Sequence, residues 1–363
     1  MSARDGRYMD RALELARRGW GRVHPNPMVG AVVVRNGIVI GEGHHQEYGG
    51  PHAEVLALRE AGAAARGATL YVTLEPCAHH GKTPPCVDAI IEAGIAEVVY
   101  AAADPHTSAR GGADRLRDAG VRVTEGVERD AARTLNAAFF HVQEHGTPFV
   151  ALKLAMSLDA GIAKAPGVPT QITGPAARAA MHALRSGFDA ILIGVGTALT
   201  DDPLLTVREA PVWRAPVRIV VDTRARLPLT ARLVASLDQA PLWVIVAEDA
   251  PADRIASLEA AGVRVLRVAR AGNRVDLRAA LARLAQEGIG SVFAEGGAEL
   301  TASLLRLDLV QRLYMFLAPL FLGPGAVPAF GLAQPQRERW RCTSTEWLGS
   351  DVLVTMDLPP EAV

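Results

Sequence analysis

Hydrophobic and polar positions in the first 145 residues change between helical and strand-like spacing. Apolar residues recur every three to four positions over 8–19 and predict a helix. Two apolar runs, 29–34 and 38–41, flank Asn36-Gly37, which is the strongest short signal for a hairpin. The remaining predicted strands of this half are 69–74, 96–103 and 121–125, and its remaining predicted helices begin at His52 and cover 86–92, 113–119 and 129–145.

The same alternation starts again after a break at His145-Gly146-Thr147-Pro148. The run Phe149–Leu154 then predicts the first strand of a second domain. Later predicted strands are 189–194, 217–222, 242–246, 263–268, 290–294 and 311–318, with helices at 175–186, 252–261 and 276–286 and a final hairpin of 341–348 and 351–357. We therefore expect two α/β domains, 1–146 and 147–363.

Composition agrees with this division and excludes several classes of protein. A chain of 363 residues is too long for one typical core. Its 38 Lys and Arg residues balance 39 Asp and Glu residues, so no basic surplus indicates a nucleic-acid partner. No run of 18 apolar residues predicts a membrane span, and no apolar signal segment opens the chain. The three cysteines do not suggest a disulfide framework, so we expect a cytoplasmic protein.

One cluster of residues in the first half carries a recognisable chemistry. His52 and Glu54 lie two positions apart, and Cys77 and Cys86 each follow a proline. One imidazole and two thiolates bind Zn²⁺ and leave a fourth position for water, whose pKa the metal lowers to about 7. Glu54, outside the metal shell, is placed to carry protons between that water and a departing amine. This is the pattern of the zinc deaminases.

Two other interpretations of these residues stay open from the sequence. Cys77 and Cys86 could be buried apolar cysteines. A zinc-stabilised binding module without turnover is also consistent, with His79 or His80 as a fourth ligand. The spacing is unusual for a deaminase, because eight residues rather than two separate the cysteines. Their polar groups could face a substrate.

The second half contains two glycine turns that each follow an apolar strand. The first is Gly194–Thr197, and the second is Gly296-Gly297 before an expected helix. Glycine there allows phosphate oxygens to approach backbone N–H groups at a helix N-terminus. Arg185 and Arg208 could hold a phosphate, although both could equally be solvated surface residues. A tight strand–helix turn without a ligand explains the glycines as well. A nucleotide site is thus plausible but not identified.

Together these motifs resemble the bifunctional deaminase–reductase family of riboflavin biosynthesis, over nearly the whole chain. The segments that carry the resemblance are His24–Gly30, Pro51–Glu54, Thr73–Cys86, Leu152–Asp159, Ala198–Arg208 and Glu295–Gly297. The long insertion between the cysteines is distinctive of that family among zinc deaminases. The resemblance implies a cytidine-deaminase-like three-layer domain followed by a dihydrofolate-reductase-like α/β domain.

The resemblance also implies two reactions, two cofactors and a set of site residues. The deaminase would hydrolyse the 2-amino group of a diaminopyrimidinone ribosylamino 5′-phosphate, and the reductase would convert ribosyl to ribityl with NADPH. Zinc would bind His52, Cys77 and Cys86, and Glu54 would be catalytic, as would Lys153 and Asp201 in the reductase. Substrate contacts would be Arg185, Leu205, Arg208 and Glu295. Cofactor contacts would be Met156, Gln171, Thr197, Asp201, Thr223, Gly297, Ala298, Glu299, Leu300, Thr301, Ala302 and Ser303.

The departures from the family pattern are all in the reductase half. Met156 and Ala160 replace a small residue and a glycine, and Pro169 and Gln171 replace a serine and a tryptophan. An alternative is therefore a deaminase of another pyrimidine-type substrate joined to an inactive or differently specific reductase-like domain. A deaminase of free nucleosides or nucleic-acid bases is a further rival. The neutral charge and the second domain count against it.

We expect a small-molecule substrate, no nucleic-acid or membrane partner, and a homo-oligomer.

Overall fold

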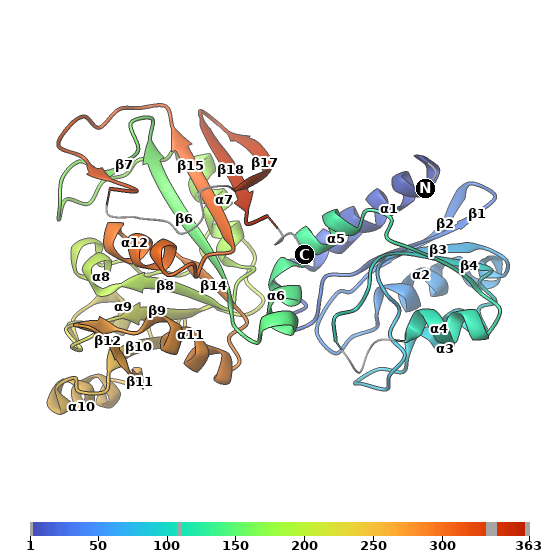
Figure 1. The fold of residues 1–363 in the computed structure, drawn as a ribbon, viewed down its shortest axis with the longest axis horizontal. Helices are drawn as coiled ribbons and strands as arrows, with labels where there is room; N and C mark the ends of the chain where they lie inside the picture. Colours follow the sequence, from blue (N-terminus) through green and yellow to red (C-terminus); the bar gives the residue numbers. More distant parts are fainter. Residues whose placement is uncertain (1–2, 107–110, 332–339, 360–363) are drawn as a thin grey trace. The chain divides into compact units, whose positions relative to one another are not determined.

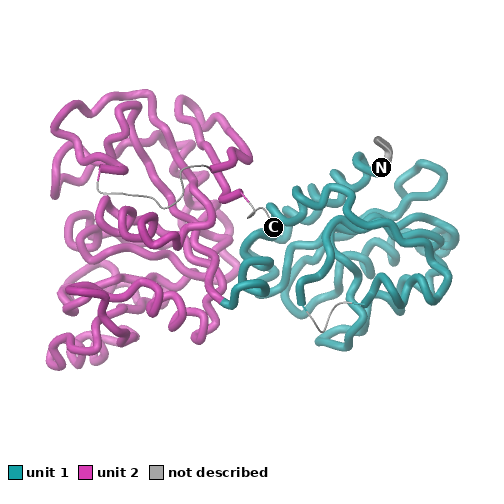
Figure 2. The backbone as a smooth tube through the Cα atoms, viewed as in Figure 1, with its two compact units in different colours: residues 1–146 teal, residues 147–363 magenta. Residues whose placement is uncertain are grey.

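The structure, a computed structural model, describes residues 3–106, 111–331 and 340–359. It separates into two compact units, Met1–Gly146 and Thr147–Val363 (Figure 1, Figure 2). Among the described residues, no helix is both long enough and apolar enough to cross a membrane.

The first unit is built on a five-stranded sheet of order β2-β1-β3-β4-β5. Strands β2, β1 and β3 pair antiparallel, whereas β3, β4 and β5 are parallel. The strands are β1 (Gly30–Arg35), β2 (Ile38–His44), β3 (Thr69–Leu74), β4 (Glu97–Ala102) and β5 (Arg122–Glu125). The helices are α1 (Ala3–Ala16), η1 (Arg17–Gly19), α2 (Ala53–Ala61), η2 (Gly62–Ala65), α3 (Cys86–Glu92), α4 (Gly112–Asp118), α5 (Arg129–Leu135) and α6 (Ala137–His145).

Alternation along β1 explains why this unit has three layers. Ala31 and Val33 are fully buried against α2, α3 and α4, whereas Val32 and Val34 face α1, α5 and α6. Successive side chains of a strand point to opposite faces, so a strand apolar at every position needs helices on both sides. The expected three-layer α/β architecture of this domain is confirmed.

The single helix expected over 129–145 is wrong, because Asn136 divides it into α5 and α6. The backbone of Asn136 departs from helical geometry, with φ −104° and ψ 28°. Its buried side chain accepts a hydrogen bond from the Met28 amide at 2.8 Å and donates to the Met28 carbonyl at 2.9 Å. The Asn136 side chain thereby anchors the loop before β1 to the junction of the two helices.

The second unit contains a nine-stranded sheet of order β11-β10-β9-β8-β14-β6-β15-β18-β17. All neighbours from β11 to β15 are parallel, and β18 and β17 complete the sheet antiparallel. The strands are β6 (Phe149–Ser157), β7 (Gly161–Ala163), β8 (Ala190–Gly194), β9 (Val217–Val221), β10 (Leu242–Ala247), β11 (Arg264–Val268), β12 (Arg270–Ala271), β13 (Arg274–Val275), β14 (Ser291–Ala294), β15 (Arg312–Ala318), β16 (Val327–Pro328), β17 (Arg341–Leu348) and β18 (Asp351–Asp357). The helices are α7 (Pro175–Arg185), α8 (Val195–Asp201), α9 (Arg232–Ala235), α10 (Ala252–Ala260), α11 (Leu277–Gln286) and α12 (Ala298–Arg306).

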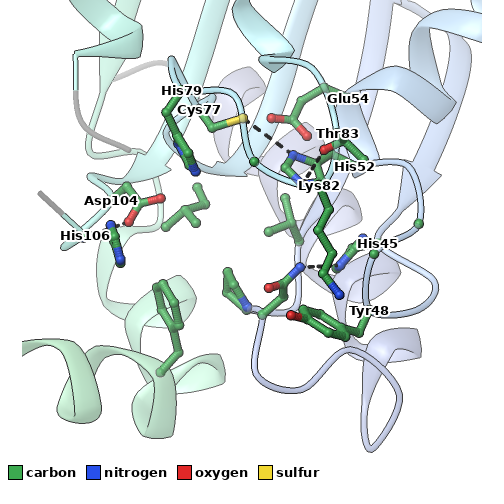
Figure 3. A pocket seen from close by; sticks show the side chains of 18 of the residues that line it. His45, Tyr48, His52, Glu54, Cys77, His79, Lys82, Thr83, Asp104 and His106 are labelled. Atoms are coloured by element: carbon green, nitrogen blue, oxygen red, sulfur yellow. Dashed lines mark hydrogen bonds between the residues drawn. The ribbon is translucent and has the colours of Figure 1, made fainter. Parts of the chain in front are cut away.

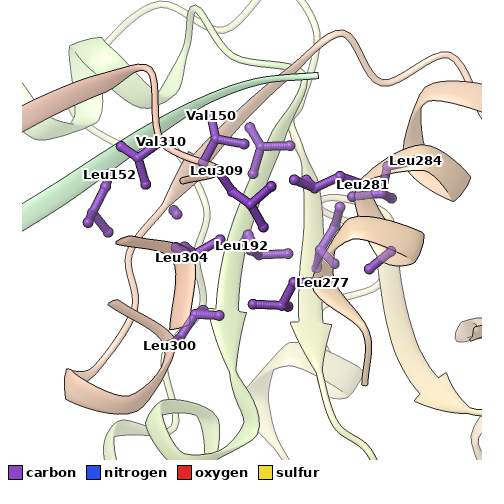
Figure 4. Packing of buried hydrophobic residues seen from close by; sticks show 14 of the residues in the cluster. Val150, Leu152, Leu192, Leu277, Leu281, Leu284, Leu300, Leu304, Leu309 and Val310 are labelled. Carbon is purple, nitrogen blue, oxygen red and sulfur yellow. The ribbon is translucent and has the colours of Figure 1, made fainter. Parts of the chain in front are cut away.

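Two apolar cores cover the two faces of this sheet. One core joins α11 and α12 to strands through residues such as Leu152, Leu192 and Leu304 (Figure 4). The other packs α8, α9 and α10 against the opposite face, through Ile193 and Val220 among others. Because β9, β8, β14 and β6 are parallel neighbours, the segments that follow β9, β8 and β14 leave the sheet at its carboxyl edge. Ligands bind at this edge in open α/β sheets.

One sequence expectation changes in the second unit, and one departure from the family pattern has a backbone consequence. The glycine turn expected at Gly194–Thr197 is largely helix, because α8 begins at Val195 with Gly194 as its N-cap. Ala160, which replaces a family glycine, adopts φ 57°. This left-handed conformation is unfavourable for residues with a Cβ. The chain thus keeps a glycine-like backbone at Ala160 at some cost in stability.

Candidate active sites

Three elements of the first unit bring the metal-binding candidates together. His52 is the N-cap of α2, Cys86 is the first residue of α3, and Cys77 lies in the loop after β3. A Cβ on Gly43 would lie only 2.3 Å from the Ala53 carbonyl oxygen, so glycine at this position allows the first turn of α2 to pack closely on β2. Both helix N-termini carry a partial positive charge that favours thiolates.

The donor atoms of His52, Cys77 and Cys86 have the spacing of a shared metal site. His52 Nδ1 lies 3.0 Å from Cys86 Sγ and 3.6 Å from Cys77 Sγ, and all three donors lie within 4.8 Å of one another. A tetrahedral zinc with bonds of about 2.0 Å to nitrogen and 2.3 Å to sulfur holds such ligands about 3.5 Å apart. The residues present therefore fit a zinc ion.

The two thiols interact, so that their contact raises the pKa of Cys86 while it lowers that of Cys77. Bonding to the Cys86 thiol, opposed by burial and aided by His52, lowers the pKa of the Cys77 thiol to about 4. The Cys86 amide also donates to Cys77 Sγ at 3.4 Å. Thr83 Oγ1 lies 3.3 Å from His52 Nε2, the ring nitrogen that faces away from the sulfurs. Such outer contacts fix the orientation of a metal-binding histidine.

Glu54 lies in the first turn of α2, beside this set but outside it. Its side chain is buried and lines the same cavity as His52 and Cys77 (Figure 3). Burial raises the pKa of Glu54, opposed mainly by the charge of His52. Among the described residues, no fourth His, Cys, Asp or Glu joins the three donors. A closed structural site would require such a ligand, whereas an open position suits catalysis.

The cavity has a volume of about 280 Å³ and is lined by further polar residues, three of them from the insertion whose polar groups were expected to face a substrate. They are Asn26, His45, Tyr48, His79, Lys82, Thr83, Asp104 and His106. His79, Lys82 and Thr83 come from the insertion between the cysteines, and the ammonium of Lys82 lies 3.9 Å from the centre of the Tyr48 ring (Figure 3). Asn26 lies within the first motif, but Asp104 and His106 follow β4 without a sequence signal.

In the second unit, three predicted residues form one ionic cluster. Arg185 Nε and Nη2 lie 2.5 and 2.9 Å from the two carboxylate oxygens of Glu295, and Lys153 Nζ lies 3.4 Å from Glu295 Oε2. Burial opposes the ionisation of Glu295, but the charges of Arg185 and Lys153 outweigh it and lower the pKa of Glu295 to about 2. Arg185 is therefore a buried partner of Glu295 rather than a solvated surface residue.

The segment 201–208 lies next to this cluster. Arg185 Nη1 donates to the Thr206 carbonyl at 3.2 Å, and Arg208 Nη1 donates to the Thr206 hydroxyl at the same distance. Leu205 is buried with φ 53°, and Asp201, at the end of α8, is within electrostatic range of Lys153. The structure thus brings the predicted substrate and catalytic residues of this half together.

The predicted cofactor residues come mainly from the segments after β8, β9 and β14. A Cβ on Gly297 would lie 3.2 Å from Thr197 Oγ1, so α8 and the start of α12 approach closely. Gly297 is the N-cap of α12, which contains 298–303. The hydroxyl of Thr223 accepts a hydrogen bond from the Val275 amide at 3.2 Å. Met156 is buried in β6, whereas Gln171 is exposed.

The fold and the donor set define a zinc-dependent deaminase domain joined to a dihydrofolate-reductase-like domain. Residues 2–102 match the family model of the cytidine and deoxycytidylate deaminase zinc-binding region, and 148–354 match that of the RibD C-terminal domain.

Relatives and solved structures agree over nearly the whole chain. The chain is 40% identical to riboflavin biosynthesis protein RibD of Aquifex aeolicus, over 96% of this chain and 97% of that protein, and 41% identical to RibD of Escherichia coli, over 89% of each. Its structure resembles RibD of Acinetobacter baumannii with a TM-score of 0.84 and 36% identity, over 98% and 99% of the two chains. The structure also resembles a diaminohydroxyphosphoribosylaminopyrimidine deaminase/5-amino-6-(5-phosphoribosylamino)uracil reductase from Thermotoga maritima. The TM-score is 0.83 and the sequence identity 36%, over 98% of this chain and 99% of that one.

The chain belongs to the riboflavin biosynthesis protein RibD family, and it is a bifunctional deaminase and reductase. The alternative of a deaminase of another pyrimidine-type substrate with an inactive reductase-like domain is not favoured. Zinc and NADPH are the cofactors of the two halves.

Proposed function

We propose that the first unit hydrolyses the 2-amino group of 2,5-diamino-6-ribosylamino-4(3H)-pyrimidinone 5′-phosphate. The second unit then reduces the ribosyl group of the product to ribityl with NADPH. The observation that carries the first step is the placement of buried Glu54 in one cavity with the donors of His52, Cys77 and Cys86.

Glu54 is the proton carrier of the deamination. When bound, zinc supplies a water of lowered pKa and polarises it for attack on the ring. The Glu54 carboxylate accepts a proton from that water and returns one to the departing amine, so that water is consumed and ammonia leaves.

Other residues of the cavity hold the substrate. Lys82 places a positive charge on the cavity wall, which suits the 5′-phosphate. Its contact with the Tyr48 ring orients the ammonium group before substrate binds. Asp104 and His106 contribute polar groups on the wall that follows β4.

In the reductase, Arg185, Leu205, Arg208 and Glu295 form the proposed substrate site. The exposed guanidinium of Arg208 provides charge for the phosphate, whereas Arg185 already pairs with Glu295 and therefore holds that carboxylate in place. Lys153 and Asp201 are the proposed polar groups beside the hydride-transfer centre.

The proposed NADPH site is the N-terminus of α12 after Gly297, together with Thr197 and Thr223. Backbone N–H groups at a helix N-terminus suit phosphate oxygens.

Two of the departures lie among the proposed cofactor contacts. Gln171 stands where the family has a tryptophan, so a stacking contact is replaced by an exposed amide. Met156 is buried within β6 and leaves the strand register intact. Binding through the α12 backbone does not depend on either side chain. We further propose that the enzyme is a cytoplasmic homo-oligomer that acts on a small molecule without nucleic acid.

The test is incubation of the full chain with the diaminopyrimidinone substrate, with and without NADPH, and identification of the products by mass. The expected result is the uracil product without NADPH and the ribityl product with it. Failure to oxidise NADPH in the presence of the uracil product would overturn the reductase assignment. Release of ammonia from free cytidine instead would favour the rival nucleoside deaminase.

A further inference from the structure

His45 follows β2 directly and is 3% exposed, yet both of its ring nitrogens have polar partners. Its Nδ1 lies 3.2 Å from the carbonyl oxygen of Pro51, and its Nε2 lies 3.0 Å from Asn26 Nδ2. The ring stands edge-on to the ring of His52, with centroids 5.5 Å apart and an interplanar angle of 82°. His45 therefore connects the cavity wall at Asn26 to the peptide that leads into the first metal-binding residue.

The partners of His45 determine its tautomer. A carbonyl oxygen can only accept a hydrogen bond, so His45 Nδ1 carries a proton. In a neutral imidazole the other nitrogen is then an acceptor, which matches a donating amide nitrogen of Asn26.

This tautomer in turn fixes the direction of the Asn26 amide. If the amide turned over, its carbonyl oxygen would face the lone pair of His45 Nε2, and the hydrogen bond would be replaced by repulsion. Asn26 lines the cavity, and among the described residues its Oδ1 has no hydrogen-bond partner. A molecule in the cavity therefore meets a fixed acceptor at this point, which suits an N–H or O–H donor.

We propose that His45 is a positioning residue of the deaminase, which as its Nδ1–H tautomer presents Asn26 Oδ1 to a donor group of the substrate. Through the Pro51 carbonyl, it also holds the peptide bond that precedes His52. The inference rests on the proposed deaminase function. If His45 only filled the core, the effect of replacing it would not depend on Asn26. If His45 positions Asn26, replacing it should matter only while Asn26 is present.

Four variants of the full chain test this coupling: His45→Asn, His45→Gln, Asn26→Ala and the double variant Asn26→Ala/His45→Asn. Asparagine retains a donor near the Nδ1 position only, whereas glutamine places an acceptor near the Nε2 position. Losing one oriented hydrogen bond to substrate corresponds to roughly 5- to 100-fold in affinity. We expect His45→Asn to raise the deaminase KM by about that factor, with zinc content unchanged. His45→Gln should recover most of the loss.

In the Asn26→Ala background, His45→Asn should have little further effect on KM. Fully additive effects, or a glutamine variant no better than asparagine, would overturn the proposal. The neighbouring His44, the last residue of β2, is the matched control, because it is not among the residues that line the cavity, and His44→Asn should leave deaminase kinetics unchanged. Reductase activity of the same preparations, measured with the uracil intermediate, checks that the rest of the chain is intact.

A measurement on the unchanged protein does not depend on how the variants fold. ¹⁵N NMR of histidine-labelled protein should show a ring with protonated Nδ1 and unprotonated Nε2, whose signals disappear in His45→Gln. Protonation at Nε2 instead would overturn the proposal. If the unchanged protein shows the expected tautomer but does not deaminate the substrate, the proposed function fails while the geometry at His45 stands.

Discussion

Arg185 and Glu295 form a two-point ion pair across 110 residues of sequence, and both side chains are less than a tenth exposed. Lys153 adds a second positive charge to the same carboxylate. Breaking such a buried pair leaves an uncompensated charge, which costs on the order of 3–5 kcal/mol. The pair therefore joins α7 to the segment after β14.

Glu295→Gln should destabilise the second unit at neutral pH, and this loss should shrink on acidification. The pKa of Glu295 is about 2 in the folded protein, below its usual value. Its ionised form therefore contributes stability above about pH 4–5. As the pH falls toward 2, that contribution, about 3 kcal/mol by linkage, is lost from the native protein but not from the variant. Urea unfolding between pH 6 and pH 3 measures the difference.

The exposed Glu248 is the matched control, and Glu248→Gln should change stability by less than about 0.5 kcal/mol at either pH. If the native protein and Glu295→Gln lose stability in parallel on acidification, the ion pair does not set the stability of this unit.

Cys86→Ser should lose zinc, whereas Cys342→Ser should retain it. Cys86 supplies one of the three converging donors, and Cys342 is exposed on β17. A serine hydroxyl is a much poorer zinc ligand than a thiolate, because the metal binds the deprotonated sulfur. Metal analysis of purified protein should give about one equivalent per chain for the native protein and the Cys342 variant. Equal zinc in all three proteins would refute the assigned donor set.

Sequence periodicity predicted individual elements well, because local apolar patterns determine them. The bounds of β3 agree with the run 69–74, and Asn36-Gly37 forms the expected turn, with both residues at positive φ. Contacts between distant segments carried no such signal. Asn136 binds the backbone of Met28 across 108 residues, and the backbone leaves helical geometry at the same residue, within a segment that periodicity alone predicted as one helix.

The two candidate sites also differ in how much of each could be predicted from the sequence. The convergence of His52, Cys77 and Cys86, with Glu54 beside them, was predictable because the proposed chemistry restricts both residue type and spacing. The role of His45 was not, since an isolated histidine is more often a core residue than a functional one. Arg185 and Glu295 were both expected at the reductase site, but only the structure pairs them with each other.

Glu54→Gln should abolish most deaminase activity and leave zinc bound. The side chain lies in the cavity but outside the group of donors, so the amide keeps the shape of the carboxyl while losing its proton transfer. Positioned proton transfer contributes roughly 10²–10⁴-fold to rate. We therefore expect kcat to fall by at least 100-fold. Glu60→Gln, on the exposed end of the same helix, is the control; loss of zinc in Glu54→Gln would instead make Glu54 a ligand.

Ala160→Gly should stabilise the second unit. Ala160 has φ 57°, where a residue with a Cβ is less stable by roughly 1–2 kcal/mol. Glycine removes this strain but adds backbone entropy to the unfolded chain, so the net gain should be about 1 kcal/mol. Thermal unfolding should show a Tm higher by about 2–4 °C. Ala163→Gly, within β7, should lower Tm, and a similar decrease in Ala160→Gly would contradict the strain at that residue.

Residues 1–146 alone should fold, bind zinc and deaminate. The apolar clusters described in the first unit draw all their residues from that unit, and those of the second unit lie entirely beyond residue 146. A segment with its own closed core can fold independently. The fragment should therefore show one cooperative thermal transition, about one equivalent of zinc, and a deaminase kcat within a few-fold of the full chain.

Fragment 1–136 is the matched control, because it lacks α6 and the buried Phe140. It should unfold at a clearly lower temperature. A fragment 1–146 that lacks a cooperative transition would show that the first unit depends on the second for its stability.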